Sequence, residues 1–337
     1  MIGVFIIPTG VGAEIGGHAG DATPAARLIA GCCDKLIIHP NVVNASDINE
    51  ATDNMLCVEG SQLDKFLEGD VNLREVMSNK ILVAVNKPAV PDTINAVSAA
   101  IATLGVEAEI IELRTPLVMR ASFTERGAAH GEVAGAVQLV GQVKDPKYDF
   151  DALAIHTRID VSREVSFDYL ENGGVNPWGG VEAIASGIIA QELYKPVAHA
   201  PIENFTPEDQ LTVFGTIHDP RLSAEMVSSC FLHCVLKGLH RAPRLVRPQT
   251  PGSLSVKDVS FLISPWGLYG EPHQLAIRNG IPLIYVRENQ TIFNEKQPEG
   301  AISVNNYLEA AGLVMALRGG VNPKSLTRPL VLPVIHS

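Results

Sequence analysis

Residues 4–10 read Val4-Phe5-Ile6-Ile7-Pro8-Thr9-Gly10, an apolar run that ends abruptly in polar residues. Continuous apolar runs are typical of strands buried on both faces, as in parallel sheets. Seven more runs end in the same way, before His39, Asn86, Arg114, His156, His199, Ser264 and Arg287. Between them, apolar residues recur at helical spacing over 92–104, 132–143, 181–193, 223–239 and 305–317. We therefore expect an α/β protein with a mainly parallel, Rossmann-like, doubly wound sheet and helices on both faces.

A polar stretch near the middle of the chain is the best candidate for a domain boundary. We expect an N-terminal α/β half over 1–145, a C-terminal α/β half over 151–320 and an extended tail over 321–337. A single continuous domain is the alternative, because Lys144-Asp145-Pro146-Lys147 could equally be a surface loop inside one sheet.

Composition excludes several classes of partner. The 337 residues carry a formal net charge of -11 and only 5% aromatic residues. This charge opposes binding to a polyanionic backbone, and few aromatic rings are available to stack on bases, so we expect no nucleic-acid partner. No apolar run approaches the ~20 residues that span a bilayer, and residues 1–4 lack the cationic region of a signal peptide. The 5 cysteines have no framework spacing. We therefore expect a cytoplasmic protein with no membrane partner.

A glycine-rich loop, residues 9–21, follows the first predicted strand and precedes a predicted helix. Glycines let a backbone approach a ligand closely, and a helix N-terminus presents free amides to an anion. The candidate ligand-binding residues of this loop are Thr9, Gly10, Gly12, Gly16, Gly17 and Asp21. The spacing departs from the dinucleotide fingerprint, because the third glycine comes one residue late and the second strand ends in His39 instead of an acidic residue. The loop therefore predicts an anion site or a tight structural turn, and it disfavours a nicotinamide site.

Three histidines at predicted strand ends are candidate catalytic residues, namely His39, His156 and His199. Histidine titrates near neutral pH, so one of them could act as a general acid or base. Glu203, after the strand of His199, is a further candidate as a carboxylate base. Two alternatives stay open, because the histidines could be structural or could ligate a divalent metal with Asp21, Glu203 or His273. They match no recognised metal motif, so we assign no metal ligand.

Two connections are too long for simple turns, and we expect both to be loops over the site. Residues 114–131 include Arg120. Residues 158–180 include Arg158, Asn176, Trp178, Gly179 and Gly180. Gly-rich hinges would allow such a loop to close over a ligand as a lid.

The remaining candidate ligand-binding residues also follow predicted strands. Arg287 suits bidentate binding of a carboxylate or phosphate, and Lys87 suits a Schiff base or a phosphate contact. The others are Asn41, Asn44, Ser264, Glu288 and Asn289. Cys230, His233 and Cys234 share one helical face, but their apolar neighbours favour a buried helix over a soft-metal or redox site.

Several motifs carry a resemblance to a known family. Residues 7–21 together with His39-Pro40-Asn41-Val42-Val43-Asn44 resemble an uncharacterised domain-of-unknown-function family (DUF3326) of photosynthetic bacteria and plastids. Residues 176–183 and 280–289 look like its later motifs. The similarity extends over nearly the whole chain. Membership of this family implies a soluble cytoplasmic or plastid protein and leaves the chemistry open.

Because the carboxyl ends of parallel strands meet at one edge of a sheet, we expect the eight strand ends to lie together and to form the site at the C-terminal edge of the parallel sheet. These features together predict an enzyme that acts there on a small anionic metabolite, either a carboxylate or a phosphate. Acid–base chemistry of the lyase, isomerase or hydrolase type fits best, and a dehydrogenase fits less well because the dinucleotide pattern is defective. The alternative is a non-catalytic metabolite or nucleotide sensor on the same scaffold. We expect a homo-oligomer, and the sequence identifies no cofactor.

Overall fold

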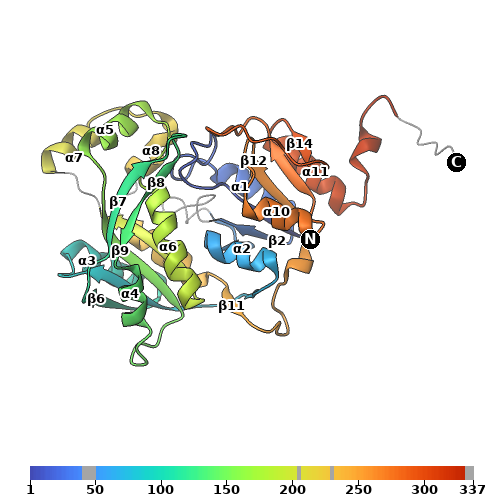
Figure 1. Cartoon of the computed structure of the whole chain (residues 1–337). Helices are drawn as coiled ribbons and strands as arrows, with labels where there is room; N and C mark the ends of the chain where they lie inside the picture. Colours follow the sequence, from blue (N-terminus) through green and yellow to red (C-terminus); the bar gives the residue numbers. More distant parts are fainter. Residues whose placement is uncertain (40–50, 203–205, 228–230, 331–337) are drawn as a thin grey trace.

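The computed structural model describes residues 1–39, 51–202, 206–227 and 231–330 (Figure 1). Four residues singled out in the sequence, Asn41, Asn44, Glu203 and Cys230, lie outside the described residues. The described part of the chain confirms the α/β class, because it forms two large, mainly parallel sheets with helices packed on them. Within these residues, no helix is both long and apolar enough to cross a membrane.

The first sheet takes its strands from both ends of the chain. Its order is β14-β13-β12-β1-β2-β3, and neighbouring strands are parallel. The strands are β1 (Ile2–Phe5), β2 (Lys35–Ile38), β3 (Met55–Cys57), β12 (Val259–Pro265), β13 (Leu283–Val286) and β14 (Ile302–Val304). Side chains of β1 alternate between the two faces, so Phe5 joins one apolar core and Val4 joins the other.

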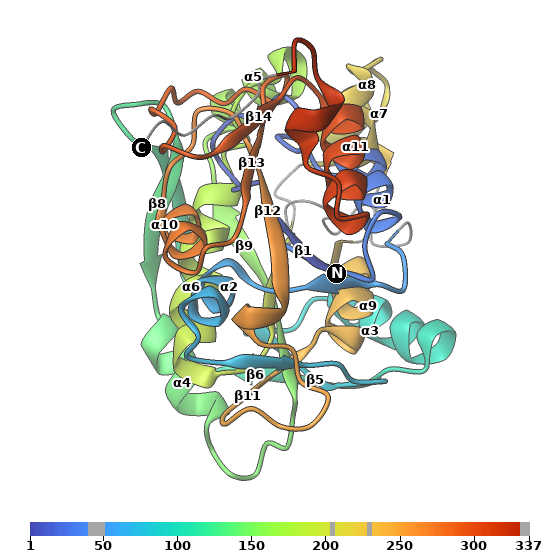
Figure 2. The same cartoon turned by 90° about the vertical axis from the view of Figure 1, so that its right-hand side faces the viewer.

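Helices cover both faces of the first sheet, as Figure 2 shows. The core of Phe5 is completed by α1 (Thr23–Ala30) and α11 (Tyr307–Arg318). The core of Val4 is completed by α2 (Gly60–Glu68) and α10 (Glu271–Arg278). The expected doubly wound, Rossmann-like arrangement is therefore confirmed for this sheet.

The second sheet comes from the middle of the chain and has the order β6-β5-β9-β7-β8, with β10 also paired to β9. Its strands are β5 (Lys80–Asn86), β6 (Glu107–Leu113), β7 (Val118–Phe123), β8 (Ala129–Ala134), β9 (Ala152–Asp160) and β10 (Val197–Ile202). Only β7 and β8 pair antiparallel within this sheet as the described residues form it. A small antiparallel pair joins β4 (Asn72–Arg74) to β11 (Arg244–Val246).

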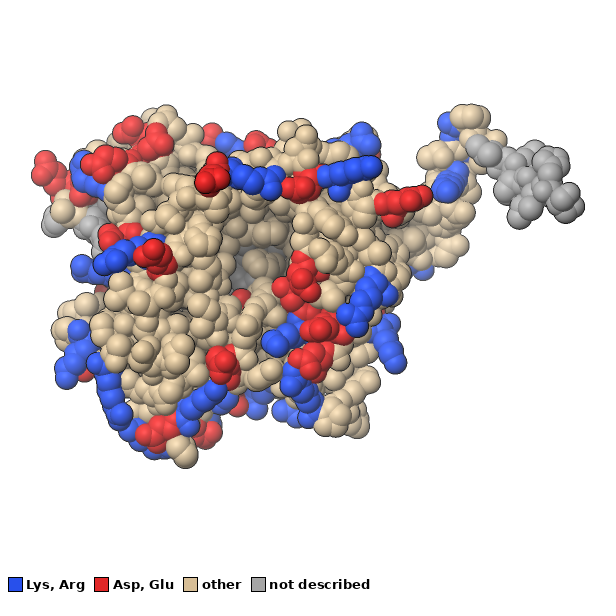
Figure 3. All heavy atoms as spheres, in the orientation of Figure 1, with Lys and Arg blue, Asp and Glu red and all other residues tan. Residues whose placement is uncertain are grey.

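The second sheet is also covered on both faces. One core lies under α4 (Ala136–Val143) and α6 (Gly179–Leu193), and the other lies under α3 (Pro91–Leu104) and α9 (Phe231–Arg241). Three further helices, α5 (Arg163–Asn172), α7 (Pro207–Phe214) and α8 (Pro220–Val227), share a small apolar cluster of their own. The two sheets lie side by side in Figure 1, and the space-filling view of Figure 3 is hollowed between them.

All eight apolar runs are strands, but the expectation that they end at one edge is wrong. Four of them belong to each sheet, so there are two carboxyl edges. In addition, β9 continues to Asp160 and β10 to Ile202, which places His156 and His199 inside strands. The two strands pair from Leu153 and Val197 to Arg158 and Ile202, with His199 opposite Ile155, and this pairing carries both past the end of their apolar runs.

The prediction of two long loops is also wrong for most of the residues concerned. Residues 118–134 form the β7–β8 hairpin, and residues 158–180 contain the end of β9, α5 and the start of α6. The sequence of the hairpin shows no run of apolar residues, because most of its side chains are exposed or half-buried. Residues 145–151 connect α4 to β9 within the second sheet. Each of the two sheets takes strands from the chain before this stretch and from the chain after it.

Candidate functional site

The glycine-rich loop is fastened by the segment that follows β13. The fully buried Asn289 accepts a hydrogen bond from the Ile15 N–H at 2.9 Å, and its amide donates to the Ile15 carbonyl at 2.8 Å and to the Tyr307 hydroxyl at 2.7 Å. Backbone hydrogen bonds also join residues 11–14 to residues 290–292. Asn289 was predicted to bind a ligand, and here its side chain holds the loop instead.

Several predicted glycines are required by close contacts within the protein. A Cβ at Gly179 would lie 1.9 Å from the Thr9 Oγ1, and one at Gly180 would lie 2.3 Å from the Ala129 carbonyl oxygen. At Gly10, whose φ is +71°, a Cβ would lie 2.8 Å from the Ala129 side chain. These glycines therefore let the loop, β8 and the first turn of α6 approach one another.

The other loop glycines make similar contacts. A Cβ at Gly12 would meet Ile292 and Val175 at 3.0 Å, one at Gly16 would meet Ile7 at 2.6 Å, and one at Gly17 would meet the Ala13 carbonyl oxygen at 2.1 Å. Several amides of the same loop donate to protein acceptors. The Gly16 N–H donates to Asp21, and the Ala19 N–H donates to Glu225 Oε1 at 2.6 Å. An anion at these amides would therefore take the place of a protein group.

A buried hydrogen-bond network joins this loop to α5 and α8. The His18 Nδ1 lies 2.7 Å from the Tyr169 hydroxyl, which donates to Glu225 Oε2 at 3.0 Å. Because the hydroxyl has a single proton, the His18 Nδ1 carries its own proton and donates to the tyrosine oxygen. The Asn176 amide donates to Glu225 Oε1 at 3.2 Å and to the Tyr169 oxygen at 3.3 Å.

Burial controls the protonation of this network. It raises the pKa of Glu225 to about 7 and that of Asp21 to about 7, although hydrogen bonds from the Ala19 and Gly16 amides oppose the rise. Burial, with a smaller contribution from the charge of Arg221, lowers the pKa of His18 to about 4. Two carboxyl groups with a pKa near neutrality lie beside a neutral histidine, which is a pattern typical of functional sites.

The start of α6 places a second ionisable pair next to this network. The Asn176 Oδ1 accepts from the Trp178 and Gly179 amides at 3.0 and 3.2 Å, and so it fixes the first turn of the helix. Glu182 then lies in that turn, with its Oε1 2.8 Å from the His199 Nδ1. The charge of Glu182 also contributes to the raised pKa of Glu225. The two sets of residues are therefore electrostatically coupled.

His156 and His199 are held by threonines. The Thr157 Oγ1 lies 3.1 Å from the His199 Nε2, and the Thr93 Oγ1 lies 2.8 Å from the His156 Nδ1. Burial and the charge of His199 lower the pKa of His156 to about 4. The side chain of Glu182 is 26% exposed against 1% for His199, so the carboxylate is the member of that pair that meets solvent.

The structure brings together some predicted residues and leaves others apart. His39 follows β2, and its ring lies against Gly60 at the start of α2, where burial lowers its pKa to about 4. Trp178 packs edge-on against Tyr169 with ring centroids 5.6 Å apart. Sequence reasoning missed His18, Tyr169, Glu225 and Glu182. His18 stood inside the quoted glycine-rich motif and Glu182 inside the motif of residues 176–183, whereas Tyr169 and Glu225 occupy helices that carry no motif.

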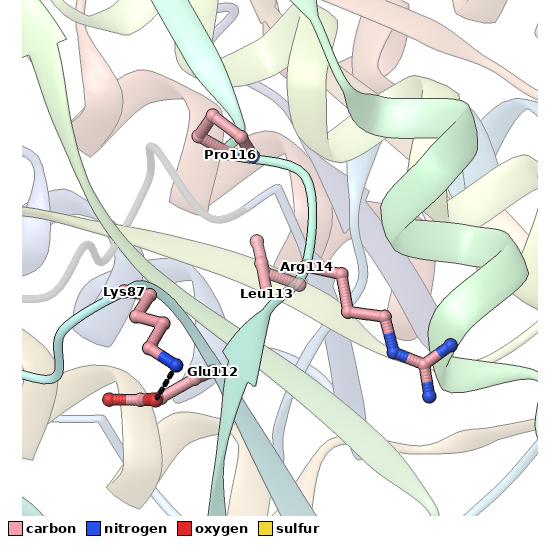
Figure 4. Close-up of a pocket in the computed structure, with 5 residues that line it drawn as sticks. All are labelled: Lys87, Glu112, Leu113, Arg114 and Pro116. Carbon is pink, nitrogen blue, oxygen red and sulfur yellow. Dashed lines mark ion pairs between the residues drawn. The ribbon is translucent and has the colours of Figure 1, made fainter.

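The predicted cationic residues have partners elsewhere. Lys87 lines a pocket of about 440 Å³ with Glu112, Leu113, Arg114 and Pro116, and it lies 3.9 Å from the Glu112 carboxylate (Figure 4). In the same view Arg114 points away from Lys87. The Arg120 Nε lies 3.8 Å from Asp160, Arg287 stacks over the Trp266 ring at 5.1 Å, and the Arg158 side chain is exposed. Glu288 accepts from the Tyr307 amide at the start of α11 at 3.3 Å.

Ser264 belongs to a buried structural group. The Gly270 N–H donates to the His273 Nδ1 at 3.0 Å, so the proton of the neutral ring is on Nε2, which lies 2.8 Å from the Ser264 Oγ. The ring also stacks on Tyr285 with centroids 5.6 Å apart. Because Nε2 donates, this histidine cannot accept the serine proton.

The metal alternative finds no support in the described residues. Among them, no group of three or more His, Cys, Asp or Glu side chains is arranged to hold a metal ion. The network instead offers hydrogen-bond donors and carboxyl groups that exchange protons near neutral pH.

Two comparisons with known proteins bear on the family of this chain. A model of the family described as "Protein of unknown function (DUF3326)" matches residues 2–327. The chain is 33% identical over 342 residues to an uncharacterized lipoprotein of Synechococcus sp., covering 97% of this chain and 93% of that protein. The predicted family resemblance is confirmed, and it extends over nearly the whole chain.

Proposed function

The chain belongs to the DUF3326 family, and we propose that it is an enzyme that performs acid–base chemistry on a small anionic metabolite. One observation carries this proposal. The Glu182–His199 pair lies beside Glu225, a carboxyl group whose pKa is raised to about 7, at the junction of the glycine-rich loop, α6 and α8. A carboxylate or an imidazole that is held in place can act as a general acid or base.

Each member of the pair has its own role in this proposal. Glu182 is the partly exposed group, so we assign to it the proton transfer with the substrate. His199 is a positioning residue, because its Nδ1 faces Glu182 and its Nε2 is held by the fully buried Thr157. Proton abstraction in a lyase or isomerase fits these roles.

An anionic substrate is supported by the donors around the site. Three of them, from Ala19, Tyr169 and Asn176, point at the carboxylate oxygens of Glu225. Hydrogen bonds from these three donors oppose the rise that burial causes in the pKa of Glu225, so they favour an ionised carboxylate at this position.

We propose the cytoplasm as the location of the chain. Cys32 and Cys33 are buried and the other described cysteines are half-buried, so none of them presents a fully exposed thiol to which a lipid could be attached. The Synechococcus relative carries the name lipoprotein, so mass spectrometry of the protein purified from membrane and soluble fractions decides between a lipid-bearing and an unmodified chain.

A thermal-shift screen of carboxylates, phosphates and nucleotides, followed by turnover assays on each ligand found, tests the proposed function. We expect Glu182→Gln to lower kcat by about 100-fold or more, because the carboxylate that exchanges the proton is lost. Glu192→Gln is the matched control, since Glu192 lies on the same helix and pairs at the surface with Lys144. Ligand binding without turnover would instead support the sensor, and full activity of Glu182→Gln would overturn the assigned role.

A further inference from the structure

The carboxylate of Glu225 is bound by donors from three separate elements. The Ala19 N–H and the Asn176 amide reach Oε1 at 2.6 and 3.2 Å, and the Tyr169 hydroxyl reaches Oε2 at 3.0 Å. Both oxygens are therefore engaged by neutral donors in the glycine-rich loop, on α5 and in the connection that precedes α6. This is the arrangement that a protein uses to recognise a carboxylate group.

The three donors are fixed by residues other than Glu225. The Tyr169 oxygen accepts from the His18 Nδ1 at 2.7 Å, and the Asn176 Oδ1 is tied to the first amides of α6. The loop around Ala19 is fastened by Asn289, as described above. The donors consequently form a preorganised cradle that does not depend on the glutamate for its shape.

Glu225 itself lies on α8, whose described side chains lie outside the cores of the two sheets. α8 has eight residues, and its described contribution to an apolar core is Leu222, which packs with Tyr169, Leu170 and Val213 in a cluster separate from the cores of the two sheets. Elements with few buried apolar contacts open locally at a low free-energy cost. Among the described side chains, none on α8 joins the core of either sheet, so a displacement of Glu225 from the cradle would not have to break those contacts.

We propose that Ala19, Tyr169 and Asn176 form a carboxylate-binding site that Glu225 fills in this structure and that the carboxylate of the substrate occupies during turnover. The proposal rests on the proposed function, because Glu182 would then lie beside the bound metabolite. A carboxylate fits better than a phosphate. The three donors engage the two oxygens of one carboxylate, whereas a phosphate would bring more charge and a further oxygen with no donor assigned to it.

Removal of the glutamate side chain tests the site by direct binding. We expect Glu225→Ala to lower Tm by about 5 °C, because three buried donors lose their acceptor. Sodium acetate or formate at about 100 mM should restore at least about half of this loss by filling the cradle. Sodium chloride and sodium phosphate at equal ionic strength should restore much less. Glu171→Ala, at an exposed position on α5, is the matched control and should show no specific response to acetate.

A second variant tests whether the named donors are responsible. In the background of Glu225→Ala, Tyr169→Phe removes the hydroxyl and should weaken acetate binding about 10-fold or more. Rescue by chloride equal to that by acetate, or unchanged rescue after Tyr169→Phe, would overturn the proposal. This test measures binding and not turnover, so its result does not depend on whether Glu182 takes part in catalysis. The carboxylate site and the proposed enzymatic activity can therefore be refuted independently.

If Glu225→Ala does not fold, the wild-type cradle is tested by fluorescence. Trp178 packs against Tyr169 and is one of the 2 tryptophans of the chain, so Trp266→Phe makes it the sole reporter. Acetate titration should change its emission with saturation, whereas chloride should not. An emission that responds equally to both salts contradicts the site.

Discussion

Asn289 completes a ladder of hydrogen bonds that the glycine-rich loop cannot form alone. We expect Asn289→Ala to lower the free energy of unfolding by about 3 kcal/mol or more, because the Ile15 amide and carbonyl and the Tyr307 hydroxyl lose buried partners. Urea unfolding measures the loss. Asn305→Ala serves as the control, since Asn305 is exposed and bonds to Glu309 at the surface. Equal losses for the two variants would contradict the role of Asn289.

Ser264 and His273 resemble a catalytic pair but have the wrong protonation for one. The Gly270 amide donates to Nδ1, so Nε2 donates toward the serine and cannot act as its base. Ser264→Ala should therefore leave turnover of any identified substrate within about twofold and lower stability by about 1 kcal/mol. Steady-state kinetics and thermal unfolding check the two parts. A loss of activity without a loss of stability would contradict this structural role and support the predicted contact of Ser264 with a ligand.

Single residues show what the sequence could and could not predict about the site. His156 and His199 follow apolar runs that are visible in the sequence, and the pairing of β9 with β10 brings them close enough to interact. Tyr169 and Glu225 come from helices whose polar positions look like solvated surface. Only the packing of α5 and α8 against the glycine-rich loop converts them into buried partners.

At the scale of elements, α6 approaches β8 closely enough to exclude side chains. We expect Gly180→Ala to destabilise the protein by about 2–3 kcal/mol, because a Cβ there would lie 2.3 Å from the Ala129 carbonyl and the helix would have to move. Gly141→Ala on α4 is the matched control. A Cβ at that position meets nothing within 4 Å, so the higher helix propensity of alanine should stabilise by about 0.5–1 kcal/mol. Thermal unfolding distinguishes the two, and a neutral Gly180→Ala would contradict the close contact.

Some helices and strands are easier to predict from the sequence than others. Long apolar runs predicted the central strands of both sheets, because those strands are covered by helices on both faces. The β7–β8 hairpin was missed, since its strands are held by backbone pairing and expose most of their side chains. The three-residue strands β3 and β14 at the edges of the first sheet are too short for periodicity to detect.

At the scale of the whole molecule, buried histidines and buried carboxyl groups oppose each other in the pH dependence of stability. Burial lowers the pKa of His18, His39, His156 and His273 to about 4, so their contribution is present above their ordinary value of 6.5 and is lost as the pH falls toward 4. Burial raises the pKa of Asp21, Asp64 and Glu225 to about 7, so their contribution is present below pH 4 and is lost as the pH rises toward 7.

Replacing one of these carboxyl groups should change how the stability of the protein depends on pH. Asp21→Asn retains an oxygen for the Gly16 amide but no longer titrates. We expect its stability relative to wild type to rise by about 1 kcal/mol per pH unit between pH 5 and 7 and then to level off. Urea unfolding at each pH measures the difference. A difference that is independent of pH would contradict the raised pKa of Asp21.

The fold class of the whole molecule could be predicted from the sequence, but the order of the strands in its sheets could not. Nothing local in Val4 or Leu262 indicates that their strands are neighbours, although they pair in the first sheet across most of the chain. The expected homo-oligomer stays a prediction, which light scattering of the purified protein tests. Residues 321–330 project from the body with exposed Leu326 and Leu330 and are the segment to delete in that experiment.

The first sheet takes its strands from both ends of the chain, and this affects how the protein folds during synthesis. The ribosome delivers the chain from its N-terminus, so β1, β2 and β3 emerge long before β12, β13 and β14 exist to complete their sheet. The second sheet has all its described strands once Ile202 has emerged. We therefore expect the middle of the chain to fold during translation, while the first three strands await the last three and depend on chaperones for protection.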